Sequence, residues 1–324
     1  MGKRYYLFRG SETPFNNSSS ASIAGDKFGT NKLLEMGGIP VPKAIFLHVS
    51  DFQAGYLEER ILGLQFPVVI KPLINGAKGL DVLCNIASME QLTLFLSQYF
   101  LRHDYLLIEE FHGNLKSYRV LVFNRRVVGV VLRFPASVIG DGRHTIKELV
   151  ELTNTQRLLN NALGPILIDE ECHIKLNELG LDVEHIPAEG VRIVLCYTSN
   201  ASRGGLYKSL GKKICKKNRQ LMIKAATLLN LDFTGIDVEC TDITIPIESS
   251  KGVIIEVNHR PSIRIHELPI SGEPILVTRK IIRSFIYRHP LSYLQALYTN
   301  PRTGVYFRCF ILGCIVAISY YLMH

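Results

Sequence analysis

The pattern of apolar and polar positions predicts short strands and helices in mixed order along the chain. Strands are predicted where apolar residues alternate with polar ones or run together, and helices where they recur every three to four positions. The order shows no regular strand–helix–strand repeat, so the prediction is an α+β fold rather than a doubly wound sheet. Predicted strands cover residues 44–48, 66–71, 105–109, 120–131 (a hairpin turning at 124–126), 191–197, 233–239 and 253–258, and predicted helices cover 26–36, 51–63, 88–101, 145–161 and 212–230.

Two of the predicted strands carry polar side chains on a single face. Side chains of a strand alternate in direction, so Glu256 and Asn258 share one face, and Asp237 shares one with Glu239. If the two strands pair, Asp237, Glu256 and Asn258 can converge. Two carboxylates and an amide oxygen are hard ligands of the kind Mg²⁺ uses when it also binds substrate phosphates. Ordinary strand residues facing solvent would give the same pattern at either segment alone.

A lysine and a glycine-containing loop follow one apolar strand. Lys71 ends the run at residues 66–72 (FPVVIKP), where it can present a point charge to phosphate oxygens. Residues 75–82 (NGAKGLDV) supply glycines that let backbone amides approach a polyphosphate, and Lys78 adds charge. A glycine hairpin with a solvated lysine is the alternative, since neither common phosphate-loop motif is present.

A third apolar strand ends in acids. Residues 105–111 (YLLIEEF) place Glu109 and Glu110 directly after it. The backbone of such a strand end can pair with an adenine edge, and an acidic side chain can accept hydrogen bonds from ribose hydroxyls. Solvated acids at a strand end are the simpler alternative.

Taken in order, these segments resemble the ATP-grasp domain of cyanophycin synthetases and bifunctional glutathione synthetases. The resemblance covers about residues 23–278 and is most distinctive at residues 137–146 (SVIGDGRHTI). Other matching segments are GDKFGTNKLLEMGGIPVPKA, FPVVIKPLINGAKGLDV, LLIEEFHG, YRVLV, NASRGG, LDFTGIDVE and VIIEVNHRPSIRIHELP. The resemblance implies two α+β lobes that clasp ATP between them.

The resemblance also implies roles for individual residues. Basic positions near the phosphates are Lys27, Lys71 and Lys78, and an adenine-side hinge runs from Glu109 through Glu110 to Phe111. Asp237, Glu256 and Asn258 match metal ligands for Mg²⁺, with Mn²⁺ as an alternative. Arg119 matches a nucleotide-side position, and Arg133 and Arg264 match basic positions beside the phosphates or the acyl intermediate.

The implied activity is ATP-dependent formation of an amide bond between a carboxylate and an amine, through an acyl phosphate. The expected substrates are an amino acid or a small peptide. Because positioning and fixed charge do the chemistry, no covalent nucleophile is expected. The alternative is a nucleotide-binding protein that has lost ligase activity and acts as a membrane-tethered regulator or scaffold.

The sequence departs from its relatives at several places. Only about 25 residues precede Lys27, where relatives carry a further domain, so we expect a homodimer or a partner protein to complete the acceptor site. Ser117 stands where an acid is usual, which weakens a ribose contact. Cys196 and Tyr197 replace basic residues, and Arg203 is expected to compensate. The Mur-like domain of cyanophycin synthetase is missing, which argues against polymerisation.

Composition narrows the class of protein. A formal net charge of +8 suits an anionic ligand or membrane surface, while no nucleic-acid-binding module accompanies it, so we expect no nucleic-acid partner. The 7 cysteines form no C-x-x-C pair, which predicts reduced thiols in a cytosolic body. Five cations at residues 212–219 are either a solvated helix face or a headgroup contact, and His266 is either structural or a substrate contact.

The C-terminal segment is strongly apolar. Residues 305–322 (VYFRCFILGCIVAISYYL) contain one charge, Arg308, and tyrosines near both ends, as membrane-spanning helices do. A buried terminal helix or strand is the alternative. The predicted organisation is an N-terminal tether (1–22), an ATP-grasp domain (23–285), a basic linker (286–304) and a transmembrane tail (305–322), with the body in the cytoplasm in either case.

Overall fold

The computed structural model describes residues 13–73, 81–160 and 163–323. The chain divides into two units. The first, Leu7–Ile275, is called the body here, and the second consists of Leu276–His324 with Met1–Tyr6. In the described residues, the body contains sheets of four, five and two strands, and the second unit contains helices alone.

A four-stranded antiparallel sheet in the order β1-β4-β2-β3 forms the first lobe of the body. All five residues of β2 are buried, Lys71 among them. Ile70 and Ile108 of the sheet pack with Leu92 and Leu96 of α5 in one core. The elements of this lobe are β1 (Ala44–His48), α3 (Val49–Gln53), α4 (Leu57–Arg60), β2 (Val68–Pro72), β3 (Leu83–Ile86), α5 (Met89–Tyr99) and β4 (Tyr105–Glu110).

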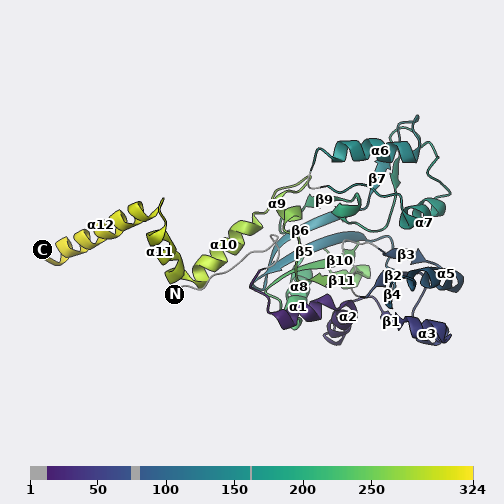
Figure 1. The fold of residues 1–324 in the computed structure, drawn as a ribbon, viewed down its shortest axis with the longest axis horizontal. Helices are drawn as coiled ribbons and strands as arrows, with labels where there is room; N and C mark the ends of the chain where they lie inside the picture. The colour runs from purple at the N-terminus through teal and green to yellow at the C-terminus, as the bar shows by residue number, and fades with distance from the viewer. Residues whose placement is uncertain (1–12, 74–80, 161–162, 324) are drawn as a thin grey trace. The chain divides into compact units, whose positions relative to one another are not determined.

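A five-stranded antiparallel sheet in the order β11-β10-β5-β6-β9 forms the second lobe (Figure 1). Ile236 and Val238 of β10 pack in a core with Met222 of α8. Asp237 therefore points to the opposite face, because strand side chains alternate. The elements are α1 (Ser18–Gly25), α2 (Lys27–Met36), β5 (Lys116–Phe123), β6 (Arg126–Phe134), β9 (Leu206–Ser209), α8 (Lys216–Leu228), β10 (Phe233–Cys240), η2 (Ile247–Ser250), β11 (Val253–Asn258) and α9 (Arg264–Glu267).

A smaller lobe carries α6 and α7 on a two-stranded sheet (Figure 1). Helix α6 begins with a capping box in which Thr145 and Glu148 bond each other's backbone N–H groups. Ile146, Leu176 and Leu195 belong to its separate core. The elements are β7 (Ser137–Ile139), α6 (Ile146–Arg157), α7 (Glu170–Glu178), β8 (Arg192–Val194) and the short η1 (Ala201–Arg203).

The predicted elements are present, with changes at their ends. Asp26 caps α2 by accepting a hydrogen bond from the Gly29 backbone. The hairpin turns at Asn124 and Arg125, both with positive φ, which matches the twist of paired strands. Four predictions need correction. Residues 51–63 form parts of two short helices, α3 and α4, rather than one helix, and the helix predicted at 145–161 ends at Arg157. The strand predicted at 191–197 is shorter and covers only Arg192–Val194, and the helix predicted at 212–230 begins at Lys216.

The predicted tether also differs from the structure. Residues 18–25 form α1, and Asn17 caps it by accepting a hydrogen bond from the Ser20 backbone. Asn16 bonds the backbone of Phe233 in both directions, from its Nδ2 to the carbonyl at 2.7 Å and from the Phe233 N–H to its Oδ1 at 3.0 Å. Turn-forming residues had suggested a loop here, but Ser and Asn also favour helix N-termini.

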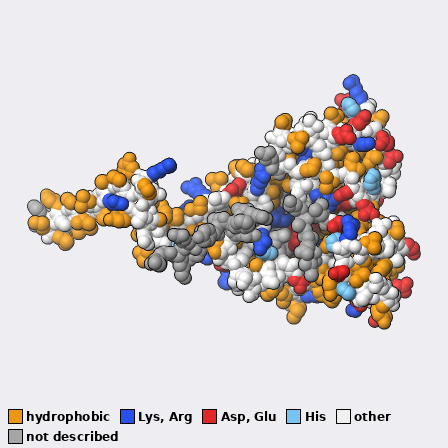
Figure 2. All heavy atoms as spheres, in the orientation of Figure 1, with side chains coloured by type: hydrophobic (Ala, Val, Ile, Leu, Met, Phe, Trp, Pro, Cys, Tyr) orange, Lys and Arg blue, Asp and Glu red, His pale blue; other side chains and the backbone are white. Residues whose placement is uncertain are grey.

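The C-terminal unit is a run of three helices: α10 (Val277–Arg288), α11 (Pro290–Thr299) and α12 (Gly304–Met323). Helix α11 lies within the segment predicted to be a linker. Helix α12 has 20 residues, a mean hydropathy of 1.8 in its most apolar window, and none of that window is buried. Hydrophobic side chains cover most of its visible face (Figure 2). An exposed apolar helix of this length fits the predicted transmembrane tail, whose membrane location stays a prediction.

Candidate active site

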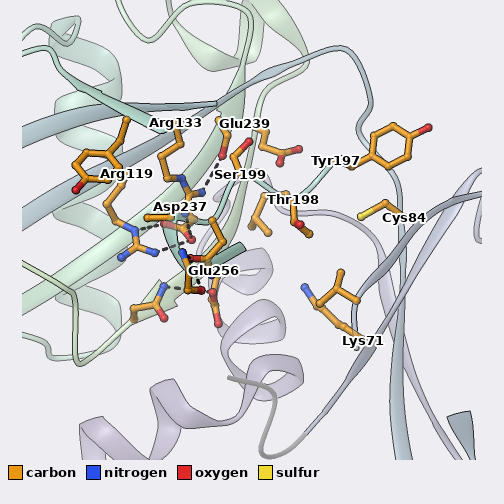
Figure 3. Close-up of a pocket in the computed structure, with 18 of the residues that line it drawn as sticks. Lys71, Cys84, Arg119, Arg133, Tyr197, Thr198, Ser199, Asp237, Glu239 and Glu256 are labelled. Atoms are coloured by element: carbon orange, nitrogen blue, oxygen red, sulfur yellow. Dashed lines mark hydrogen bonds and ion pairs between the residues drawn. The ribbon is translucent and has the colours of Figure 1, made fainter. Parts of the chain in front are cut away.

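A cavity of about 850 Å³ opens in the body, within the usual size range of ligand sites. The first lobe contributes Lys71 and Glu109, and the second lobe contributes Arg119, Asp237 and Glu256. Figure 3 shows Lys71 and Cys84 on one side of it, with Arg119, Arg133, Asp237 and Glu256 on the other. Of the predicted site residues, the following line the cavity: Lys27, Lys71, Glu109, Glu110, Phe111, Arg119, Arg133, Asp237, Glu256, Asn258 and Arg264.

Lys71 and Glu109 form a buried ion pair on neighbouring strands. The distance from Lys71 Nζ to Glu109 Oε1 is 2.6 Å, and 10% and 6% of the two side chains are exposed. Burial alone would lower the pKa of the Lys71 ammonium, but the Glu109 carboxylate more than offsets this, and the pKa is raised. Lys71 thus stays charged, as phosphate binding requires.

Lys27 provides a second cation. It is the first residue of α2, and its Nζ donates to the carbonyl oxygen of Pro72 at 3.0 Å, at the end of the strand that carries Lys71. Burial lowers the pKa of Lys27, and Lys71 lowers it further, while Glu256 acts in the opposite direction. Two ammonium groups thus lie close enough to influence each other at one cavity wall.

Asp237 and Glu256 lie directly opposite one another on the paired strands β10 and β11. This is the pairing that the sequence pattern required. Asn258 is on the same face, and its Nδ2 donates to Glu256 Oε2 at 3.3 Å. Within the described residues, no group of three or more His, Cys, Asp or Glu side chains could hold a metal. The oxygen set here has two carboxylates and one amide.

Two arginines hold the Asp237 carboxylate. Arg119 pairs with it through Nε to Oδ1 and through Nη2 to Oδ2, the latter at 3.0 Å. Arg133 Nη1 donates to Oδ2 at 3.1 Å. Burial would raise the pKa of Asp237, but these two guanidinium groups outweigh it and lower the pKa. Arg133 Nη2 also donates to Ser117 Oγ at 2.8 Å, so Ser117 orients an arginine in this structure.

The predicted hinge has part of its backbone already engaged. The N–H of Glu110 donates to the carbonyl of Lys43, and the N–H of Phe111 donates to that of Pro67. Glu110 Oε1 accepts from the backbone N–H of Gln65 at 3.0 Å. The two amides are therefore unavailable to a base, and a nucleobase would have to use other groups of this wall.

Comparison with known proteins agrees with this geometry. Residues 24–147 match the family described as the RimK-like ATP-grasp domain. Over this segment the chain resembles a RimK-like ATP-grasp domain. It is 32% identical over 258 residues to the cyanophycin synthetase of Crocosphaera subtropica, covering 78% of this chain and 29% of that protein.

Two further relatives support the same family. The glutathione biosynthesis bifunctional protein GshAB of Clostridium perfringens is 31% identical, covering 86% of this chain and 36% of the relative. The solved bifunctional glutathione synthetase of Pasteurella multocida shares the fold, with a TM-score of 0.56, 24% identity, and coverage of 88% and 39%. The chain thus spans about a third of the length of these relatives. The prediction of an ATP-grasp α+β fold is confirmed.

Two residues that were predicted to contribute to the site, Lys78 and Arg203, are not among the residues found to line the cavity. Lys78 lies outside the described residues. Arg203 was expected to compensate for missing basic residues in the cavity, and this is wrong. It is buried in ion pairs with Asp169 and Glu171 and does not line the cavity. Glu171 also accepts hydrogen bonds from the backbone of Tyr197 and Thr198, so this network shapes the loop that does line it.

Sequence reasoning did not assign several lining residues of the ATP-grasp cavity. Glu239 lies two residues after Asp237 on the same face, so alternation alone could have found it. Cys84 gave no signal because it lies in a short apolar stretch typical of a core strand, and Tyr207 gave none because a single tyrosine next to Lys208 and Ser209 belongs to no motif. Burial raises the pKa of Glu239 to about 7, and Glu109 and Asp237 add to this while Arg133 opposes it.

Proposed function

We propose that the ATP-grasp body is an ATP-dependent carboxylate–amine ligase that acts on an amino acid or small peptide. The observation that carries the proposal is one cavity lined both by the cations Lys27 and Lys71 and by the oxygen-bearing side chains of Asp237, Glu256 and Asn258. Cations that neutralise phosphate oxygens and hard oxygens that hold a divalent ion are the two requirements of phosphoryl transfer. The names of the relatives, a cyanophycin synthetase and a glutathione biosynthesis bifunctional protein, support the same class.

The oxygen set fits Mg²⁺. Asp237 and Glu256 face each other directly, and Asn258 touches the Glu256 carboxylate. Such ligands suit a hard cation shared with substrate phosphates. Glu256, Asn258 and Asp237 would hold the ion, which when bound supplies positive charge to phosphoryl oxygens. Asp237 would have to give up or share its bonds to Arg119 and Arg133.

The proposed reaction balances in two steps. A substrate carboxylate oxygen attacks the γ-phosphorus of ATP, and the bond to the bridging oxygen breaks, which gives an acyl phosphate and ADP. The amine nitrogen then attacks the acyl carbon, phosphate leaves with the C–O bond electrons, and the amine proton is released to phosphate or water. Lys71 and Lys27 would stabilise charge on the transferred group, and Arg264 would stabilise the tetrahedral carbon's oxyanion.

A second candidate function is nucleotide binding without turnover. Asp237 favours it, because both of its oxygens are bonded to arginines rather than open towards Glu256. A regulator or scaffold could use the same cavity to bind ATP without the metal geometry that catalysis needs.

Release of ADP separates the two candidates. Full-length protein with Mg²⁺, ATP and pooled amino acids should release ADP only when the right substrates are present, and Glu256→Gln should abolish this. The matched control is Glu58→Gln, an exposed acid on α4. The scaffold function would be favoured if the protein binds ATP tightly but releases no ADP, whether amino-acid pools or extracts containing small peptides are added as substrates.

We also propose that α12 crosses a membrane with the body on the cytoplasmic side. The helix is 20 residues long and about 30 Å at 1.5 Å per residue, which matches a bilayer core. No Asp or Glu occurs after Glu273, while six cations lie between residues 279 and 308. Lys and Arg before a span favour the cytoplasmic side. Protein that leaves the membrane fraction on carbonate extraction would contradict this, and truncation after Asn300 should release the body.

A further inference from the structure

The strand register places four side chains in one line across the cavity floor. Glu239 on β10 is opposite Ser117 on β5, Ser117 is opposite Arg133 on β6, and Arg133 is opposite Tyr207 on β9. Directly paired residues point to the same face, and all four line the cavity. With strands about 4.8 Å apart, Tyr207 lies roughly 14 Å from Glu239 along this line.

Tyr207, at the β9 end of the line, has an unused hydroxyl. Only 2% of the residue is exposed, yet its oxygen makes no hydrogen bond within the part of the chain that the structure describes. A buried hydroxyl without a partner is unfavourable, because it has lost its hydrogen bonds to water. Its cross-strand neighbour Arg133 has the same feature at Nε, while its two Nη atoms are engaged. Two buried donors thus sit on one pair of facing residues.

The charge around Tyr207 is positive. Burial raises the pKa of its phenol, and the two charges that act on it, Arg264 and Arg157, both oppose that rise. Arg157 is committed to the carbonyls of Gly164 and Gly205, at 2.7 and 3.2 Å. Arg264 lines the cavity and is exposed. A neutral O–H donor beside positively charged guanidinium groups can bind an anionic oxygen that accepts hydrogen bonds.

We propose that the Tyr207 hydroxyl, with Arg133 Nε and the Arg264 guanidinium, binds a carboxylate group of the amino-acid or peptide substrate. The inference rests on the proposed ligase function and assigns Tyr207 as a specificity-determining residue. The phosphates of ATP are expected at Lys71 and the Asp237–Glu256 pair. Tyr207 is on β9, three strands from Asp237 in the sheet order, so it can bind an anionic group other than the phosphates of ATP. A planar carboxylate can accept from two such donors at once.

The test compares free acids with their amides. Binding of the twenty L-amino acids and glutarate to full-length protein saturated with Mg²⁺ and a non-hydrolysable ATP analogue is measured by calorimetry. The best ligand should bind at least about tenfold more tightly than its carboxamide, as for loss of one charge-assisted hydrogen bond. Tyr207→Phe should remove most of this preference and leave the affinity for the ATP analogue unchanged. The control is Tyr99→Phe, an equally buried tyrosine in the core of the first lobe.

Four results would overturn the inference. Three of them are equal binding of acid and amide, no effect of Tyr207→Phe on acid binding, and an effect of Tyr207→Phe on nucleotide affinity alone. Binding of no compound in the panel, with nucleotide affinity intact, would also overturn it. Failure of the proposed function is distinct, because it shows as absence of ADP release from protein that still binds the ATP analogue, and the acid–amide comparison can then still be made.

The carboxylate at Tyr207 can be the one that reacts or one carried by the amine substrate. Substrate labelled with ¹⁸O in that carboxylate separates the two, since acyl-phosphate formation passes one carboxylate oxygen to the released phosphate. Label in phosphate identifies the reacting group, whereas unlabelled phosphate with both labelled oxygens kept in the product identifies the amine substrate. Either result supports a carboxylate subsite.

Discussion

Asp237 and Arg119 are joined by a two-point ion pair across β10 and β5, deep in the wall of the cavity. Arg133 joins the same carboxylate from the next strand. The pair keeps Asp237 ionised, because the guanidinium groups offset the effect of burial on its pKa. It also means that a metal at Asp237 and Glu256 must compete with fixed positive charge.

Asp237→Asn should affect both function and stability. Loss of one metal ligand should lower Mg²⁺-dependent ADP release by roughly 10²–10³-fold, comparable to removal of a fixed transition-state group. It also leaves two buried arginines without their counter-charge, which should cost about 3–5 kcal/mol. A magnesium titration of ADP release and urea unfolding measure the two effects.

The double variant Asp237→Asn/Arg119→Gln separates the effects. Removing one arginine should restore part of the unfolding free energy but none of the magnesium dependence, because the ligand is still absent. If Arg119→Gln restores turnover as well, Asp237 acts through the arginine rather than on the metal.

A second prediction concerns the buried ion pair between Lys71 and Glu109. Lys71→Met leaves Glu109 buried without its partner, so the free energy of unfolding should fall by about 3–5 kcal/mol. Lys71→Met/Glu109→Gln should recover most of that loss, while ATP affinity stays reduced because the ammonium is gone. Urea midpoints and nucleotide titrations check this, and equal stability of the two variants would show that Glu109 is solvated in the native protein.

Local features of the site were predictable from the sequence. Alternation in residues 233–239 and 253–258 placed Asp237, Glu256 and Asn258 on the right faces, because Ile236 and Val238 supply the buried face. The Asp26 cap and the 124–125 turn depend only on neighbouring residues. These inferences needed no knowledge of distant contacts.

Long-range partners were not predictable in the same way. Arg119 and Asp237 are 118 residues apart, and only the β5–β10 pairing brings them together. Lys71 read as a free phosphate ligand, whereas Glu109, on the paired strand β4, binds it. Tyr207 could not be assigned from the sequence, because a single tyrosine in a short strand is ordinary and its unused hydroxyl is evident only once its neighbours are known.

A third prediction concerns the ion pairs and hydrogen bonds that hold the loop of residues 197–200. Arg203 bonds Asp169 and Glu171, and Glu171 in turn accepts from the backbone of Tyr197 and Thr198. Arg203→Met should leave Glu171 uncompensated, destabilise the smaller lobe by about 3–5 kcal/mol and loosen the loop. Amide hydrogen exchange should speed up at residues 197–200 and stay unchanged in the first lobe. Uniform protection would mean that the loop is held by other contacts.

The buried carboxyl of Glu239 predicts how stability depends on pH. Burial, the largest cause, raises its pKa to about 7 in the folded protein, whereas an unfolded chain loses this proton near about 4.3. Between those values the folded state binds more protons, so the free energy of unfolding falls as pH rises and is constant above. From pH 5 to pH 8 this group should remove roughly 1–3 kcal/mol of stability.

Glu239→Gln should abolish that loss, because a neutral amide has no proton to release. The variant should be more stable than the original protein at pH 8 and similar to it near pH 4, as judged by urea midpoints at each pH. Glu58→Gln, on the exposed surface of α4, should leave the slope unchanged. If Glu239→Gln is instead less stable at pH 8, the carboxylate is ionised and bonded in the folded protein, for example to Arg133, and the sign of the dependence reverses.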